Sequence, residues 1–215
     1  MLLLILIIIM IFSSIYFIYV KEYKNDGLER VKSTYDNKYY WVRNLPDKSK
    51  AANTLAKIRE NMFKLINYLN VNKEKFPENM SYIKDMVRRT KDIVIMETAN
   101  DEKYTSYTVN KGEKIVFCLR SKIMDEIHDM NTLMYVVIHE LGHVGCPEFG
   151  HTPLFKEIFT FLLEQSVEIG IYKPIDYRIN PQYYCGMTIN EYLLDKPKKS
   201  MSDKTDKSEK SITKK

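Results

Sequence analysis

The spacing of apolar residues predicts helices in the first half of the chain. Across residues 51–70 the apolar positions recur at intervals of three and four, which is typical of a helix with one buried face. These positions are Leu55, Ile58, Met62, Leu65, Ile66 and Leu69. A second, shorter helix is predicted over residues 82–89.

Extended segments are expected next along the chain. Residues 93–96, 104–109 and 114–119 are rich in β-branched and aromatic residues, which favour strands. The last two segments are separated by a turn-like sequence around Gly112, so they are predicted to form a hairpin. In residues 115–119 the side chains that would point to either face of the strand are apolar. Both faces of this strand are therefore expected to be partly covered.

The N-terminal segment is apolar throughout. Residues 2–20 contain no charged side chain over 19 positions, about the length that a helix needs to cross a bilayer. A cleaved signal peptide would carry basic residues before the apolar run, whereas here they follow it, beginning at Lys21 and Lys24. The positive-inside rule then puts the C-terminal part in the cytosol or inside a virion. We therefore expect a single-pass membrane protein that is anchored by residues 2–20.

Composition divides the chain into four predicted segments: a transmembrane anchor (1–20), a polar juxtamembrane linker (21–45), a folded domain (46–195) and a disordered basic tail (196–215). The tail lacks the apolar residues that ordering requires. It holds eight lysines and three acids, which accounts for the whole net charge of +5. A nucleic-acid partner is therefore not indicated, except through the tail.

The cysteines Cys118, Cys146 and Cys185 do not suggest a disulfide framework. They are an odd number at unrelated spacings, unlike the paired cysteines of small secreted domains. We expect all three to stay as thiols in a reducing compartment.

The helix predicted over residues 131–144 carries its candidate site residues on one side and its apolar residues on the other. At about 100° per residue, His143 lies about 40° from His139, and Glu140 lies about 100° from it. The other side of the helix is apolar and holds Leu133, Met134, Val137, Ile138, Leu141 and Val144. Two histidines four residues apart can direct both imidazoles at one Zn²⁺, and the adjoining glutamate can accept a proton from zinc-bound water. His139 and His143 are thus candidate zinc ligands, and Glu140 is the candidate catalytic base.

A third ligand is expected just after this helix. Gly145 and Pro147 are predicted to end it, and Thr152 and Pro153 are predicted to start another helix over residues 153–169, directly after His151. Glu164 is an alternative, because another group of zinc peptidases takes its third ligand from a glutamate further along the chain. The apolar face of the second helix lies almost opposite Glu164, which favours His151.

Several other residues are weaker candidates for a role in the site. Tyr183 and Tyr184 could return to the site, where a tyrosine hydroxyl would stabilise an oxyanion, although packing is the commoner role of aromatic residues. His128 is interpreted as a surface or capping residue. Gly142 costs about 1 kcal/mol relative to alanine inside a helix, which indicates that another part of the backbone packs closely there.

The stretch HELGHVGCPEFGHTPLF (residues 139–155) resembles the SprT-like (Spartan) and WLM metallopeptidases, which carry HExxH, a short loop, a third histidine and a nearby phenylalanine. His139, His143, His151 and Phe155 follow this order. The wider stretch over residues 51–187 is similar to membrane-anchored WLM-like metallopeptidases of large DNA viruses. The seven residues between His143 and His151 form a longer gap than is usual in WLM proteins.

The resemblance implies an α+β fold, in which a small zincin-like domain packs helices on a short sheet or hairpin and carries HExxH on a central helix. The N-terminal transmembrane helix would be added to this domain. The resemblance also implies an edge strand beside the central helix on which an extended peptide would pair. The hairpin over residues 104–119 is its expected place.

We therefore expect a membrane-anchored zinc metallopeptidase that hydrolyses peptide bonds with zinc-activated water and Glu140 as general base. One alternative is a catalytically silent membrane protein that binds zinc and peptides, and the presence of Glu140 disfavours it. Another is a structural membrane protein whose domain mediates assembly. The expected partners are a protein or peptide substrate and the membrane, and no oligomeric state is indicated.

Overall fold

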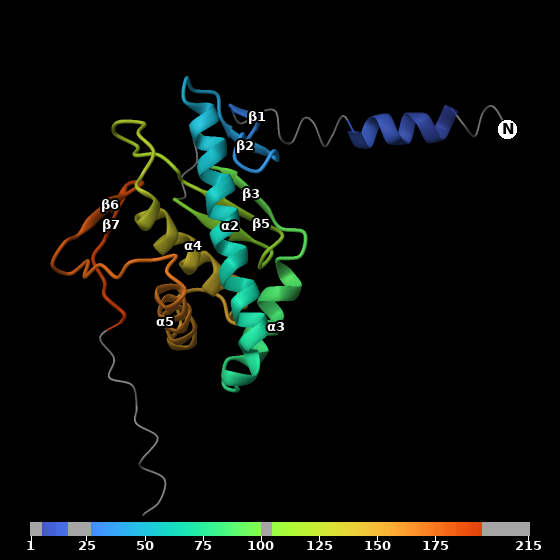
Figure 1. Ribbon diagram of the computed structural model, residues 1–215. Coiled ribbons are helices and arrows are strands. Elements are labelled where there is room, and N and C mark those ends of the chain that lie inside the picture. Colours follow the sequence, from blue (N-terminus) through green and yellow to red (C-terminus); the bar gives the residue numbers. More distant parts are fainter. Residues whose placement is uncertain (1–5, 17–26, 100–104, 195–215) are drawn as a thin grey trace, which may run out of the picture.

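The structure is a computed structural model that describes residues 6–16, 27–99 and 105–194. Its architecture is mixed α/β: helices pack on a three-stranded sheet, and hairpins lie before and after this core in the sequence (Figure 1).

Residues 6–16 are helical. Helix α2 (Lys48–Asn72) is longer but carries many charged side chains. Within the described ranges no helix is both long and apolar enough to cross a membrane. This contradicts the predicted transmembrane helix and the predicted single-pass membrane localisation. The rest of that predicted anchor, and the predicted tail, lie outside the described residues.

The helices of the domain begin and end close to the predicted positions. They are α2, followed by a 3₁₀ turn (Lys73–Lys75), α3 (Met80–Arg89), α4 (Met130–Gly145) and α5 (Pro153–Glu168). Helix α2 buries the predicted apolar face, which includes Leu55, Ile58 and Leu65. Helix α4 contacts α2, α3 and α5, so it lies at the centre of the core (Figure 1).

The sheet has the strand order β3-β5-β4. Its strands are β3 (Val94–Glu97), β4 (Tyr107–Val109) and β5 (Lys114–Phe117). β3 is parallel to β5, whereas β4 pairs antiparallel with β5 and forms the predicted hairpin. Both faces are covered, because Ile115 and Phe117 join the main core while Val116 joins a smaller cluster. β4 is an edge strand, and it contacts α4.

Residues 28–43, which were predicted to be part of a linker, form a hairpin instead. β1 (Leu28–Lys32) pairs antiparallel with β2 (Tyr39–Arg43), and both contact α2. Tyr40 and Val42 enter the main core, while Leu28 and Trp41 pack on the opposite face of the three-stranded sheet. Charged residues in β1 and in the turn between the two strands made the segment look like a polar linker.

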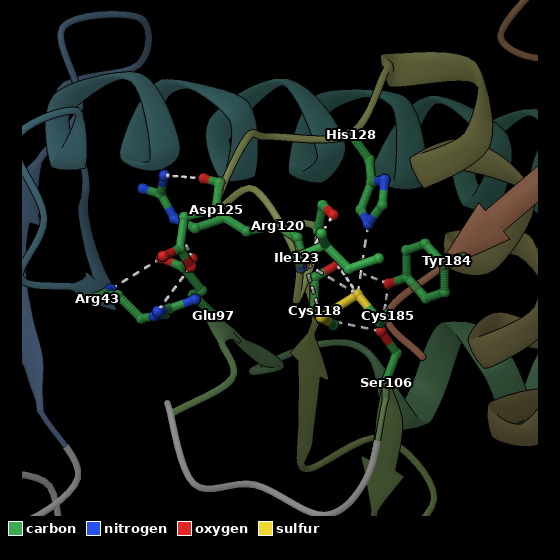
Figure 2. The surroundings of a disulfide bond; sticks show 11 residues. Arg43, Glu97, Ser106, Cys118, Arg120, Ile123, Asp125, His128, Tyr184 and Cys185 are labelled. Carbon is green, nitrogen blue, oxygen red and sulfur yellow. Dashed lines mark hydrogen bonds and ion pairs between the residues drawn. A yellow bond between two sulfur atoms is a disulfide. The ribbon is translucent and has the colours of Figure 1, made fainter. Parts of the chain in front are cut away.

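A buried ion-pair cluster joins this hairpin to the sheet and to α2 (Figure 2). Arg120 Nε lies 2.7 Å from a Glu97 carboxylate oxygen, and both side chains are 1% exposed. Arg120 Nη1 lies 2.6 Å from a carboxylate oxygen of Asp47, which precedes α2. The other Glu97 oxygen accepts from the backbone N–H of Arg43 in β2 at 2.8 Å. Burial raises the pKa of Glu97, and its cationic neighbours oppose that rise.

A second hairpin follows α5. β6 (Gln182–Tyr184) pairs antiparallel with β7 (Met187–Ile189). The two turn residues, Cys185 and Gly186, have φ values of 49° and 90°, and positive φ at both positions is the pattern of a type I′ turn. This conformation suits Gly186 but is uncommon for Cys185.

Candidate metal centre

The three histidines named from the sequence lie together. His139 and His143 are one turn apart on α4, and His151 is in the segment between α4 and α5. Helix α4 ends at Gly145 and α5 begins at Pro153, as predicted. The intervening loop reverses the chain and returns His151 to the other two.

The spacing of the imidazoles fits a single metal ion. His151 Nε2 lies 3.0 Å from His139 Nε2 and 3.2 Å from His143 Nε2. Two nitrogens that are each about 2.0–2.1 Å from a tetrahedral zinc ion are about 3.3 Å apart. The ligand atoms of all three histidines lie within 4.8 Å of one another, so the group could hold a metal ion. Glu164 is exposed on α5 and is not part of this group.

Burial sets the protonation state of two of these histidines. It lowers the pKa of His139 to about 3 and the pKa of His143 to about 4, and the neighbouring histidines add to the effect. Both imidazoles are therefore neutral at pH 7, which is the form that binds metals.

Phe155 on α5 packs against the three histidine rings. Its ring stacks on His143 at 4.2 Å between centroids and meets the rings of His139 and His151 at 5.0 Å. A Cβ atom at Gly142 would lie 3.0 Å from the Phe155 ring. The close neighbour of Gly142 is thus a side chain of α5, and not the backbone that its presence in the helix suggested.

Glu140 is next to the histidines and almost completely buried. Its carboxylate accepts a hydrogen bond of 2.8 Å from the Thr108 hydroxyl of β4. Burial raises the pKa of Glu140 to about 7, and the Thr108 hydrogen bond opposes this rise. A carboxyl group with a pKa near neutrality can both take up and release a proton at pH 7. Thr108 had no signal in the sequence beyond its place in a predicted strand.

A cleft of about 880 Å³ opens over these residues. His139, Glu140 and His143 lie along its α4 side. One wall is formed by residues 105–108 with the β4 edge, and another by Tyr184, Met187 and Ile189 of the β6–β7 hairpin. The cleft is therefore bounded by two segments that are far apart in the sequence.

The loop that carries His151 is held by Lys111, in the turn between β4 and β5. The Lys111 ammonium group donates to the backbone carbonyls of Cys146 at 2.7 Å and Glu148 at 2.6 Å. It also lies 4.2 Å from the centre of the Phe149 ring. The Lys111 side chain thus contacts the loop at Cys146, Glu148 and Phe149, just before the loop reaches His151.

Cys118 and Cys185 form a disulfide (Figure 2). This contradicts the prediction that all three cysteines stay as thiols, although Cys146 is free and buried. Cys118 directly follows β5, whereas Cys185 lies in the β6–β7 turn, 67 residues further on. The pairing depends on where the second hairpin packs, which the cysteine spacing does not show.

Two other residues with weak indications lie around this disulfide. Tyr184 lines the cleft but is 2% exposed, and its hydroxyl donates to the Cys118 carbonyl at 2.8 Å. This hydroxyl is therefore engaged in the structure rather than directed at an oxyanion. His128 is half-buried beside Tyr184, and the residue that caps α4 is Asp129.

Comparison with known proteins shows relatives in viruses. Over 164 residues the chain is 49% identical to uncharacterized protein R325 of Acanthamoeba polyphaga mimivirus, a match that covers 76% of this chain and 83% of that protein. This chain belongs to the same protein family. No model of a described protein family matches it.

Shorter matches link this family to invertebrate iridescent viruses. An uncharacterized protein of invertebrate iridescent virus 3 is 45% identical over 74 residues, 34% of this chain and 45% of that protein. One from invertebrate iridescent virus 6 is 36% identical over 81 residues, 37% of this chain and 45% of that protein.

The structure is also similar to solved structures of Wss1 from Saccharomyces cerevisiae. One crystal structure of Wss1 has a TM-score of 0.43 at 23% identity and covers 58% of this chain and 82% of that chain. A Wss1 mutant has a TM-score of 0.45 at 22% identity, covering 60% and 86%. A likeness of this degree does not indicate an activity. Any activity has to be argued from the residues of the site.

Proposed function

We propose that the chain is a zinc-dependent metallopeptidase. The main support is the convergence of the Nε2 atoms of His139, His143 and His151 in a cleft that also contains the buried carboxylate of Glu140. Three imidazole ligands suit Zn²⁺, and a catalytic zinc keeps its fourth position open for water or substrate. The resemblance of residues 139–155 to WLM metallopeptidases supports the same function.

The protein groups have separate roles in this proposal. Bound zinc would supply Lewis acidity, which lowers the pKa of a coordinated water to about 7. Glu140 would accept a proton from the attacking water and then donate it to the leaving amine. Thr108 would orient the Glu140 carboxylate through its hydrogen bond to one oxygen, so that the other oxygen can take the proton.

The proposed substrate is a peptide in an extended conformation. β4 is an edge strand and lines the cleft, so a peptide could pair with its outer edge through main-chain hydrogen bonds. Such a peptide would pass over His139 and Glu140. Val136, Met187 and Ile189 also line the cleft and would contact apolar side chains of the peptide.

Metal analysis and peptide cleavage test this proposal directly. The purified full chain is expected to hold one zinc ion, and the variants His139→Ala, His143→Ala and His151→Ala are expected to lose it. Glu140→Gln should keep the zinc but lower cleavage of a peptide library by about 10²–10⁴-fold, because the base is removed. Removal of zinc with a chelator should abolish cleavage, and added zinc should restore it.

Glu164→Ala is the matched control, because it removes the competing ligand candidate from an exposed position. It is expected to retain both zinc and activity. A folded chain without bound zinc would refute the metal site. Zinc binding without any cleavage that depends on Glu140 would instead favour a silent zinc-binding module.

A further inference from the structure

We propose that the Cys118–Cys185 disulfide clamps the two walls of the cleft together, so that the chain binds its substrate well only in the oxidised state. This inference rests on the proposed peptidase function, and it adds a form of regulation to that site. It follows from where the disulfide lies and from which groups surround it.

A closed ring of hydrogen bonds surrounds the disulfide (Figure 2). The backbone N–H of Cys118 donates to the Ser106 hydroxyl at 3.0 Å. Ser106 and Tyr184 share a hydrogen bond of 2.7 Å between their hydroxyls. Tyr184 in turn donates to the Cys118 carbonyl at 2.8 Å. Ser106 belongs to one wall of the cleft and Tyr184 to the other, so the walls are joined at this cluster.

The β6–β7 hairpin is short, and the disulfide adds a covalent link to the contacts that hold it in place. A two-stranded hairpin is only marginally stable by itself in water, and each strand here has three residues. Cys185 is in its turn, beside Gly186, and is 1% exposed. The covalent bond therefore holds the tip of the hairpin, while Met187 and Ile189 extend from it along the cleft. Without the bond, this wall is held by the hydrogen-bonded ring and by the packing of Tyr184 and Ile189 in the main core.

The surroundings also allow the bond to form again after reduction. A phosphine reductant breaks the S–S bond with one water molecule, which leaves two thiols and a phosphine oxide. Re-oxidation by a disulfide such as oxidised glutathione removes the two thiol protons and two electrons and yields two molecules of reduced glutathione. The thiolate is the attacking form, and His128 Nε2 lies 3.5 Å from Cys185 Sγ, where it can accept the thiol proton.

Burial makes reduction slow in the folded chain. Cys118 is 5% exposed and Cys185 is 1% exposed, so a reductant reaches the sulfurs only when the hairpin moves away from the loop that holds His128. The oxidised state should therefore persist once formed, and reduction should accompany opening of the cleft.

The test compares the oxidised and the reduced full chain. The zinc-loaded protein is reduced with tris(carboxyethyl)phosphine, freed of reductant under argon, and assayed with a peptide that the oxidised form cleaves. We expect kcat/KM to fall by about tenfold to a hundredfold, a range typical of misplaced substrate-positioning groups, mainly through a higher KM. Zinc content should not change, and oxidised glutathione should restore the activity. Amide hydrogens of residues 182–189 should exchange faster in the reduced form.

Two variants serve as controls. Cys118→Ser/Cys185→Ser should behave like the reduced wild type in both conditions, whereas Cys146→Ala should keep the wild-type ratio of oxidised to reduced activity. Equal kcat/KM in the two states, with zinc retained, would overturn the clamp and leave the peptidase proposal intact. If the zinc-loaded chain cleaves nothing in either state, the peptidase proposal fails; unchanged exchange of residues 182–189 on reduction would then overturn the clamp as well.

Discussion

At the scale of single residues, Lys111 connects the edge-strand hairpin to the candidate metal centre. Its ammonium group binds two carbonyls of the loop before His151 and packs on Phe149. The groups that surround metal ligands commonly change metal affinity by about 10–100-fold when they are removed. Lys111 is therefore a positioning residue for the proposed third ligand.

We expect Lys111→Met to weaken zinc binding by about tenfold, because methionine keeps the apolar stem but cannot donate to the loop carbonyls. Competition with a chromophoric chelator measures this affinity. Lys156→Met removes the same charge from an exposed position on α5 and should leave the affinity unchanged. Equal affinities for the two variants would show that Lys111 does not position His151.

Residue spacing predicted some members of the candidate site and missed others. The interval between His139 and His143 is a property of one helix, so the sequence was enough to put both on one face. Thr108 and Lys111 contact the site across tertiary interfaces, and such contacts leave no periodic signal. Tyr184 reaches Cys118 because the β6–β7 hairpin packs beside the end of β5, which the cysteine spacing did not show.

At the scale of elements, the packing of α5 on α4 controls the space around the histidines. Phe155 lies against all three imidazoles, and a Cβ atom at Gly142 would lie 3.0 Å from its ring. The ring is 2% exposed and has little room to move, so a larger residue at position 142 would push it toward the histidines.

Gly142→Ala should therefore lower zinc affinity. The new methyl group would approach the Phe155 ring to 3.0 Å, and this crowding opposes the gain of about 1 kcal/mol in helix propensity. Gly145→Ala is the matched control on the same helix, because its methyl group would meet the flexible end of Met86 at 3.3 Å. Zinc affinity measured by calorimetry should fall for Gly142→Ala alone, and a similar fall for both would point to a general effect on α4.

The helices and the central hairpin were predicted well. Their patterns of apolar residues are either long or flanked by clear turn residues. The short strands at both ends of the domain were missed for the opposite reason: β1, β2, β6 and β7 have three to five residues each. An apolar N-terminal run also suggested a membrane span. That prediction rested on 19 consecutive uncharged positions and on the basic residues that follow them, whereas no helix among the described residues is both long and apolar enough to cross a membrane.

At the scale of the whole molecule, Arg120 links the parts that surround the sheet. It pairs with Glu97 on β3 and with Asp47 before α2, while Glu97 also accepts from β2. Removing one partner of a buried ion pair leaves the other charge without compensation, which costs about 3–5 kcal/mol.

Arg120→Met should thus lower the free energy of unfolding by about 3–5 kcal/mol, as measured by urea denaturation. Arg88→Met removes an arginine from the more exposed ion pair with Asp85, and it should cost much less because exposed pairs are weak. Similar losses for the two variants would mean that the buried ion-pair cluster stabilises the fold no more than an exposed ion pair does.

The outer edge of β4 also has a consequence for self-association. An unpaired strand edge is a template for pairing with other chains, and proteins usually protect such edges with short length, charge or cover. A peptidase that pairs its substrate there has to leave the edge open. Here the strand has only three residues, and the edge faces a cleft whose opposite wall is the β6–β7 hairpin. The same hairpin that would confine a peptide would also hinder a second copy of the sheet from pairing along β4.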